Sequence, residues 1–326
     1  MIIVRITSGL GNQMFQYNFY RLMKARYPDT VVKADVRWFY SNDDHHGYEL
    51  ERIFSHPQSE WSIDEASVSD IYKVTGQLPA LIKGSLAKSI VFLEGPINRK
   101  LRERASFNKA GNIIDQLDGD ISNRNIEKDG VLINPLYETV MNLDTTRDWY
   151  IIGFWIEERY YSKRLSEAKR DYVFPESVDE NVHKLRSEIL SRDSVSIHVR
   201  RGDYLSSLYS DMFVCLGENY YKKAVEVIRE RVDSPFFYIF SDDPDWAQQS
   251  FDWLENKKVV TGNTGNASYI DMQLMASCKH NIIANSTFSQ WGALLNRNEG
   301  HLTVYPSAYL TDEDTEEKTL NGWIRV

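Results

Sequence analysis

Residues 194–204 read SVSIHVRRGDY, an apolar and β-branched run that ends in two arginines, a glycine and an aspartate. The run predicts a strand over 194–199, and Gly202-Asp203 predicts a turn directly after it. The same alternation continues downstream, with a helix at 218–231, strands at 236–240, 258–260 and 281–284, and helices at 245–254 and 269–278. Strands that alternate with helices over about 120 residues predict a parallel sheet covered on both faces.

The amino-terminal residues carry the same α/β pattern. A β-branched run at 2–6 leads into Gly9-Leu10-Gly11-Asn12, and helical spacing follows from Met14 to Met23. A second strand is expected at 30–34, just before Asp35. Glycine permits backbone conformations that other residues avoid and lets a ligand approach closely. Two glycines alone, however, are more typical of a tight turn between a strand and a helix.

Length and composition indicate two globular domains. The chain has 326 residues, of which 42% are apolar, so wholesale disorder is excluded. We place the boundary near residue 175, which gives an amino-terminal domain of 1–175 and a carboxyl-terminal domain of 176–326. Lys plus Arg number 38 against 47 Asp plus Glu, a net charge of −9. Nucleic acid is therefore not an expected partner, because its binding needs a basic face.

The cysteine count and the hydropathy pattern predict a cytoplasmic protein. Two cysteines, Cys215 and Cys278, make neither a disulfide framework nor a zinc quartet. The apolar run at residues 2–6 is too short for a signal peptide, and no run approaches the roughly 18 apolar residues of a membrane span. Peripheral association with a membrane stays open, as does the oligomeric state.

The arginine motif is the strongest candidate for an anion site. Alternation along a strand places His198 and Arg200 on one face and Arg201 on the other. One arginine is then free to meet a phosphate, whose oxygens match the guanidinium fork, while the other pairs with Asp203 or with the domain interior. The alternative is a surface turn with a structural Arg–Asp pair.

A second candidate lies between the last strand and the helix that follows it. Hydroxyl and amide groups at a helix amino terminus favour phosphate, although Ser and Thr there are also ordinary helix caps. Together with the arginines and with the Gly9–Gly11 turn of the other domain, these residues predict an anion in a cleft. The residues of this second candidate are Asn285, Ser286, Thr287, Phe288 and Ser289.

Two patterns that imitate metal sites are set aside, so no metal is expected. Asp243-Pro244-Asp245 resembles a D-x-D site, but Pro244 stands where a first-turn proline belongs, so a residue among 241–243 is interpreted as the helix cap. His45-His46 are adjacent and lack partners at ligand spacing. The aromatic run at 149–161 fits either a sugar-binding wall or, as we favour, the core.

Three motifs of the chain resemble, in order and spacing, those of glycosyltransferase family 11, the α-1,2-fucosyltransferases of bacterial type. They read GLGNQMFQY at 9–17, HVRRGDY at 198–204 and NSTFSQWG at 285–292, so the resemblance spans essentially the whole chain. One departure is Gln290, where many members carry tryptophan. We expect that difference to alter the wall of the site and not the family.

The resemblance implies the GT-B architecture, in which two Rossmann-like domains face a central cleft. The carboxyl-terminal domain would hold GDP-β-L-fucose, and the amino-terminal domain would supply most of the acceptor site. The implied reaction is an inverting transfer of L-fucose to the 2-hydroxyl of a terminal β-galactoside, without metal or cofactor. The α-1,2 linkage formed would belong to a surface polysaccharide or an oligosaccharide.

The resemblance also assigns roles to single residues. Arg200 would bind the pyrophosphate, His198 would lie near the nucleoside, and Asp271 would accept from guanine. The remaining donor-site residues are Gly9, Gly11, Arg201 and the stretch 285–289. Asn12 would hydrogen-bond the acceptor hydroxyl or the departing oxygen, and Asp35 or Asp203 would serve as the base, a choice that stays open. The alternatives are a transferase for another GDP-sugar and a nucleotide-sugar or glycan-binding protein without turnover.

Overall fold

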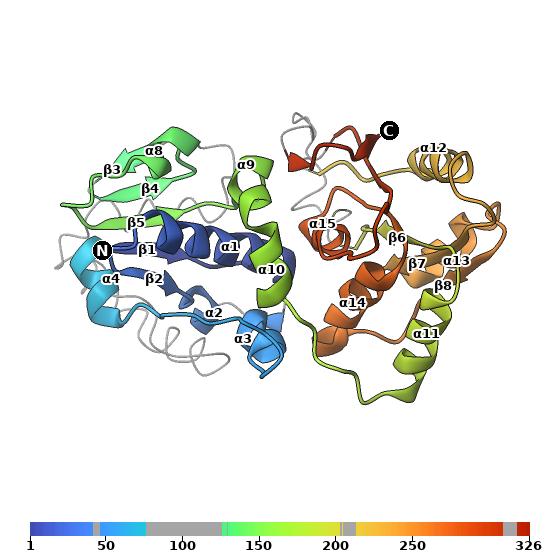
Figure 1. The fold of residues 1–326 in the computed structure, drawn as a ribbon, viewed down its shortest axis with the longest axis horizontal. Helices are drawn as coiled ribbons and strands as arrows, with labels where there is room; N and C mark the ends of the chain where they lie inside the picture. Colours follow the sequence, from blue (N-terminus) through green and yellow to red (C-terminus); the bar gives the residue numbers. More distant parts are fainter. Residues whose placement is uncertain (42–45, 76–125, 129, 203, 205–212, 309–317) are drawn as a thin grey trace, which may run out of the picture. The chain divides into compact units, whose positions relative to one another are not determined.

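The computed structural model divides into two compact units, each built around its own sheet (Figure 1). Unit 1 comprises Met1–Ser55 and Trp61–Ile156, and unit 2 comprises His56–Glu60 and Glu157–Val326. The structure describes residues 1–41, 46–75, 126–128, 130–202, 204, 213–308 and 318–326. Both units are α/β with mainly parallel sheets, so the predicted class of two Rossmann-like domains is confirmed.

The sheet of unit 1 has the strand order β2-β1-β5-β4-β3. All neighbours are parallel except β3 and β4, and Ile3 of β1 pairs with Lys33 of β2 on one side and Tyr150 of β5 on the other. The strands are β1 (Ile2–Arg5), β2 (Val32–Asp35), β3 (Ile126–Lys128), β4 (Val131–Ile133) and β5 (Trp149–Ile152). The helices are α1 (Leu10–Arg26), α2 (Trp38–Ser41), α3 (Glu49–Phe54), α4 (Val68–Thr75) and α8 (Tyr137–Met141).

The sheet of unit 2 is parallel throughout, in the order β11-β10-β9-β6-β7-β8. Its strands are β6 (Ser194–Val199), β7 (Phe236–Ser241), β8 (Lys257–Val259), β9 (His280–Ile282), β10 (Thr303–Tyr305) and β11 (Ile324–Arg325). Its helices are α9 (Glu158–Tyr161), α10 (Leu165–Asp171), α11 (Glu180–Leu190), α12 (Glu218–Arg229), α13 (Pro244–Ser250), α14 (Tyr269–Ser277) and α15 (Thr287–Leu294), with short 3-10 turns at Ser162–Arg164 and Gly265–Ala267.

Strand β6 is the centre of this core, because all six of its residues are buried. Val195, Ile197 and Val199 pack with Tyr221 and Ile228 of α12 in one hydrophobic cluster. The predicted strands and helices of this region are confirmed to within a few residues, the largest difference being that the helix expected to reach 254 ends at Ser250. A strand buried on both faces is mainly apolar, and the two arginines follow directly after its last residue, Val199.

The division between the units follows Ile156, whereas the sequence placed a boundary near residue 175. Residues between these positions are tied to α15 and the carboxyl-terminal segment. Tyr161 Oη donates to Lys318 O at 2.8 Å, and Lys169 Nζ donates to Asn296 O at 2.7 Å. The ring of Tyr172 also meets Trp291 edge-on at 5.0 Å between centroids. These long-range contacts have no signal in the local sequence.

The aromatic run at 149–161 belongs to the core, as favoured from the sequence. Its buried members are Trp149, Tyr150, Trp155, Tyr160 and Tyr161. Trp155 stacks on Phe19 of α1 with 3.6 Å between ring centroids and holds a positive φ of 58°. A Cβ at Gly153 would lie 2.7 Å from the Trp155 ring, so glycine is required for this close approach.

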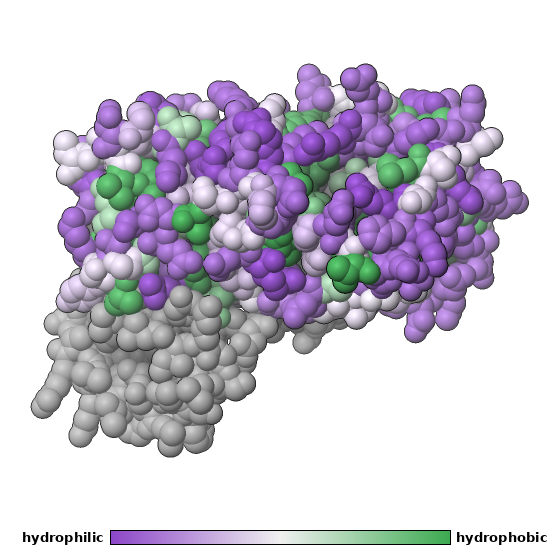
Figure 2. Space-filling view, turned by 60° about the horizontal axis from the view of Figure 1, so that its bottom comes forward, coloured by the Kyte–Doolittle hydropathy of each residue, from purple (hydrophilic) through white to green (hydrophobic). Residues whose placement is uncertain are grey.

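The coloured part of the face shown in Figure 2 is mainly hydrophilic. Large exposed apolar side chains occur on separate elements, at Val31, Tyr72, Leu136, Val178 and Leu190. Scattered apolar residues of this kind are normal on a protein surface. No helix in the part of the chain that the structure describes has the length and apolar character to cross a bilayer.

A buried amide network holds α14, α15 and the strands of unit 2 together. Asn281 Nδ2 donates to Ser196 Oγ at 2.8 Å and to Met275 O at 2.9 Å. Asn296 Nδ2 donates to Cys278 O at 2.9 Å and to Asn281 Oδ1 at 2.8 Å. Because both asparagines are almost inaccessible to water, each lost bond leaves a polar atom without solvent compensation.

The substitution Asn296→Ala tests this network. We expect it to lower the free energy of unfolding by about 2 kcal/mol, because the Asn281 and Cys278 oxygens lose a donor in a dry environment. Urea denaturation measures the change. The exposed Asn181→Ala is the matched control, for which a change within about 0.5 kcal/mol is expected. Equal effects of the two substitutions would contradict the assigned role.

Candidate functional site

The polar residues singled out in unit 2 gather at the carboxyl ends of three adjacent strands. Strand β6 leads into Arg200, its neighbour β7 into Asp242, and its other neighbour β9 into the segment that reaches Asn285. Strand β8 lies beyond β7, and the loop after it leads to Asp271 in the first turn of α14. All four loops therefore share one edge of the sheet, the edge at which ligands bind in open parallel α/β sheets.

Asp242 organises the loop that carries the arginines. Its Oδ1 accepts from the Arg201 main-chain N–H at 2.9 Å, and its Oδ2 accepts from Gly202 N–H at 3.1 Å. The same Oδ2 lies 3.2 Å from Arg200 Nη1. The Arg200 side chain is 28% exposed, so this guanidinium is both oriented by a carboxylate and open to solvent.

The carboxylates that pair with the two arginines differ in part from the expected partner. Asp203, one predicted partner and a candidate base, lies outside the described residues. Arg201 turns into the packing around α13, with Nε 3.5 Å from Asp243 Oδ2 and its guanidinium 3.9 Å from the Trp246 ring centroid. The two arginines thus take separate partners, which leaves Arg200 as the more exposed cation of the pair.

His198 is a buried neutral imidazole. Burial, and to a lesser extent the charge of Arg200, lowers the pKa of His198 from 6.5 to about 3. Its ring lies 5.7 Å from that of Phe288, which brings the arginine motif against the first turn of α15. Within the described residues its Nδ1 has no hydrogen-bond partner. A ligand donor or acceptor would satisfy this atom.

The segment 285–289 presents its main chain more than its hydroxyls. Ser286 is the N-cap of α15, yet its side chain makes no capping bond. The Ser289 hydroxyl lies inside the turn, where it accepts from Ala284 N–H and donates to Ser286 O at 3.1 Å. Asn285 Nδ2 donates to Val214 O at 2.8 Å. This helix end would therefore bind an anion through its first-turn N–H groups and the helix dipole.

Asp271 is a buried carboxyl with a polar neighbour. Its Oδ1 accepts from Asn263 Nδ2 at 2.7 Å. Burial raises the pKa of Asp271 to about 7, although the Asn263 bond opposes the shift. A carboxyl that is costly to ionise here is suited to accept N–H donors from a ligand, because they would stabilise its charged form.

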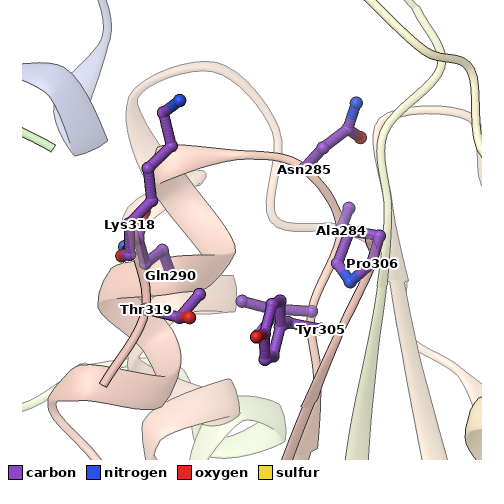
Figure 3. A pocket seen from close by; sticks show the side chains of 8 residues that line it. Ala284, Asn285, Gln290, Tyr305, Pro306, Lys318 and Thr319 are labelled. Atoms are coloured by element: carbon purple, nitrogen blue, oxygen red, sulfur yellow. The ribbon is translucent and has the colours of Figure 1, made fainter. Parts of the chain in front are cut away.

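Gln290, the departure from the family pattern, lines a small pocket beside the same segment. The pocket lies between α15 and the strand β10, with Gln290, Lys318 and Thr319 on one side and Ala284, Tyr305 and Pro306 on the other (Figure 3). Gln290 Nε2 donates to Lys318 O, which also accepts from Tyr161. Gln290 therefore holds the carboxyl-terminal segment against α15.

In unit 1 the turn before α1 is made differently from the expectation. The positive φ, 66°, belongs to Ser8, while Gly9 is the N-cap with an extended backbone that any residue adopts. Gly11 lies inside α1. Neither glycine has a positive φ, and the turn between strand and helix that the sequence favoured has its left-handed residue at Ser8. Asn12 is half-buried in the first turn of α1.

Two glutamines that the sequence did not single out anchor this turn. Gln13 Nε2 donates to Ser8 O at 2.7 Å, and Gln16 Oε1 accepts from Thr7 N–H at 2.8 Å. Gln16 Nε2 also donates to Gly153 O at 3.2 Å, which joins the ends of β1 and β5. Both glutamines belong to the GLGNQMFQY motif. The sequence signal that could have identified them is a polar residue inside an otherwise apolar helical pattern.

Asp35, the other candidate base, is committed to the fold of unit 1. Its Oδ1 accepts from Arg37 N–H at 2.9 Å, and its Oδ2 accepts from Tyr150 Oη at 2.8 Å. The residue is buried at the end of β2. With both oxygens bonded and little exposure, Asp35 holds the strand end in place, and we do not assign it the role of base.

The motif that imitates a metal site is a helix cap, as expected. Asp243 is the N-cap of α13 and accepts from Trp246 N–H at 3.1 Å, with Pro244 in the first turn. His45 lies outside the described residues, and His46 is exposed. Among the residues that the structure describes, no three His, Cys, Asp or Glu side chains are grouped to hold a metal ion.

Comparison with known proteins identifies a family. Residues 112–326 match the model described as glycosyl transferase family 11. An alpha-1,2-colitosyltransferase from Escherichia coli is 26% identical over all of this chain and 99% of its own length. The O-antigen biosynthesis glycosyltransferase WbnK from Escherichia coli is also 26% identical, over 98% and 99% of the two chains.

A partial match to an animal enzyme and a similarity to a solved structure are also found. The galactoside alpha-(1,2)-fucosyltransferase 1 of Lagothrix lagotricha is 29% identical over 46% of this chain and 43% of its own. The crystal structure of the fucosyltransferase NodZ from Bradyrhizobium is 14% identical and has a TM-score of 0.47, with 89% of this chain and 91% of NodZ covered.

The buried imidazole predicts a dependence of stability on pH. Because the folded state resists protonation of His198 down to about pH 3, the unfolded chain binds more protons below pH 6.5 and stability falls as the pH falls. Between pH 7.5 and 5 we expect the free energy of unfolding to fall less steeply in the His198→Gln variant than in the wild type. The two slopes should differ by up to about 1.4 kcal/mol per pH unit. Urea denaturation at the two pH values, with the exposed His183→Gln as control, measures the slope. Identical slopes for the wild type and His198→Gln would refute the assignment.

Proposed function

The chain belongs to glycosyl transferase family 11, and from this membership we propose that it transfers L-fucose from GDP-β-L-fucose to the 2-hydroxyl of a terminal β-galactoside. The transfer would invert the anomeric centre, use no metal, and form an α-1,2 linkage in a surface polysaccharide or oligosaccharide. The observation that carries the proposal is the position of Arg200, an oriented and solvent-open cation at the carboxyl end of β6.

The role of Arg200 follows from the charge that the reaction releases. When the bond between fucose C1 and the phosphate oxygen breaks, negative charge develops on the departing GDP. A guanidinium already oriented by Asp242 needs little rearrangement to meet that charge. The first-turn N–H groups of α15 lie on the same edge and add the positive end of a helix dipole. Together they supply the stabilisation that a metal ion supplies in other transferases.

His198 and Asp271 fit the nucleoside end of such a donor. The neutral imidazole brings no further charge beside the guanidinium, and its Nδ1 accepts or donates a single hydrogen bond. The Asp271 carboxylate would accept both N–H donors on the Watson–Crick edge of guanine, which adenine lacks. The cost of ionising this buried carboxyl is then offset by two hydrogen bonds.

Two observations favour neighbouring functions. The alpha-1,2-colitosyltransferase relative matches this chain from end to end, so a GDP-sugar other than GDP-fucose is the second candidate. Colitose lacks the 3-hydroxyl of fucose, and the described donor residues all belong to the nucleotide side of the proposed site. The ion pair between Arg200 and Asp242 is also compatible with a protein that binds nucleotide without turnover.

An acceptor and donor screen separates these functions. The full-length protein is incubated with lactose and either GDP-fucose, GDP-colitose or GDP-mannose, and the linkage of any product is assigned by NMR. We expect α-1,2-fucosyl-lactose. Product formed only with another GDP-sugar would mean that this GDP-sugar, and not GDP-fucose, is the donor. GDP binding without any transfer would mean that the protein binds nucleotide without turnover.

The substitution Arg200→Ala tests the proposed charge stabilisation. We expect kcat/KM to fall by about 100- to 1000-fold, equivalent to roughly 3–4 kcal/mol of barrier, since one preorganised donor to the leaving group is lost. Arg186→Ala, which removes an exposed arginine of α11, serves as the control and is expected to keep full activity. Activity of Arg200→Ala within a few-fold of the wild type would contradict the assigned role.

A further inference from the structure

The loop between β8 and α14 carries an amide side chain that belongs to none of the three family motifs. Asn263 Nδ2 donates to Asp271 Oδ1 at 2.7 Å, a short hydrogen bond that spans eight positions of the chain. Among the described residues it is the one hydrogen bond that the Asp271 carboxyl makes. Since a carboxylate has about four acceptor positions, most of its capacity stays open to a ligand.

The main chain holds both partners of this bond. Gly262 and Gly265 have positive φ values of 99° and 60°, a backbone conformation that other residues rarely adopt. Thr264 N–H donates to Gly262 O at 3.1 Å, which closes a tight turn around Asn263. Asp271 lies in the first turn of α14, so its main chain is fixed by the helix. The contact between the two side chains therefore follows from the path of the loop.

The same bond acts on the charge of Asp271. The residue is half-buried, and burial of its carboxyl raises its pKa to about 7, whereas the Asn263 bond lowers it. In the part of the chain that the structure describes, no charged side chain of α14 or of the elements packed against it contributes to the shift. An amide donor stabilises the charged form of a carboxyl. Without Asn263, a larger share of Asp271 would therefore be protonated near neutral pH.

The charge of this carboxyl matters for the choice between two purine bases. Guanine has two N–H donors on its Watson–Crick edge, and an ionised carboxylate accepts both. Adenine has an acceptor at N1, which matches a protonated carboxyl because that form carries a donor. Two nucleotides with the same diphosphate are therefore distinguished by the protonation state of one side chain.

We propose that Asn263 is a positioning residue for base recognition, which holds the Asp271 carboxylate as an acceptor for the N–H donors of guanine. The inference rests on the proposed function, because it takes a GDP-sugar as the donor and Asp271 as the residue that binds its base. It deepens that function by assigning the choice of guanine over adenine to a pair of side chains. In this role Asn263 acts through Asp271 and makes no contact with the base.

The experiment measures the preference of the full-length protein for GDP over ADP, by calorimetry at several pH values between 6 and 8.5. The preference is the ratio of the two dissociation constants, in which the titration of the shared diphosphate cancels. For the wild type we expect it to fall by about tenfold from pH 8.5 to pH 6, because Asp271 loses its charge as the pH falls through about 7. The pH at which half of the preference is lost is called the midpoint.

The substitution Asn263→Ala removes the donor. We expect the midpoint to move to higher pH, and the preference at pH 7 to fall by about fivefold, because the charged carboxylate loses a stabilising bond. Thr264→Ala is the matched control in the same loop, since the Thr264 side chain is exposed and makes no capping bond. It should leave the preference and the midpoint unchanged, and thermal unfolding verifies that every variant is folded.

A double variant tests whether Asn263 acts through Asp271. Asp271→Asn alone should remove most of the preference and its dependence on pH. Adding Asn263→Ala to Asp271→Asn should then cause no further change in the preference. This non-additivity separates a residue that positions Asp271 from one that contacts the base itself.

Two results would overturn the Asn263 proposal: an unchanged midpoint in Asn263→Ala, or a further loss of preference when this substitution is added to Asp271→Asn. A wild type that does not prefer GDP overturns it together with the guanine role of Asp271. Failure of the proposed transfer has a different signature, which is a preference for GDP without product from any GDP-sugar. In that case the midpoints still decide the role of Asn263.

Discussion

The hydrogen bonds and the ion pair of one carboxylate, Asp242, organise the candidate site of unit 2. It accepts two consecutive main-chain N–H groups from the loop after β6 and pairs with the Arg200 guanidinium at 3.2 Å. The loop must pass this point because β6 is buried along its whole length and exposes polar groups only at its end. A phosphate that reached this point would meet a cation already held in place by the fold.

Around that pair, the remaining groups are arranged by the parallel sheet itself. Because β7, β6 and β9 are adjacent and parallel, residues that follow them meet at one edge although they are far apart in the chain. The edge then combines a cation, a neutral imidazole and an uncapped helix end, with Asp271 in the first turn of α14, after the loop that follows β8. Each is suited to a different part of a nucleoside diphosphate, the ligand of the proposed function.

Two carboxyls, one in each unit, carry a cost for stability. Burial raises the pKa of both Glu49 and Asp271 to about 7, so their charged forms oppose folding near neutral pH. Asp271 lies on the sheet edge proposed for the donor. Functional sites commonly retain such costs, because a polar group that is fully satisfied by the protein has nothing left for a ligand.

The sequence alone determined the order of strands and helices at the amino terminus and after about residue 176, the two-domain α/β class, the family resemblance and a helix cap among residues 241–243. Periodicity, turn residues and capping are set by near neighbours in the chain. Only the tertiary structure decided the partners. Arg200 pairs with Asp242, on the neighbouring strand's loop, and Asp35 is bonded to Tyr150, 115 positions away. The division after Ile156 likewise depends on long-range packing. Strand order and burial create these contacts and shift these pKa values, and neither is encoded in a local stretch of sequence.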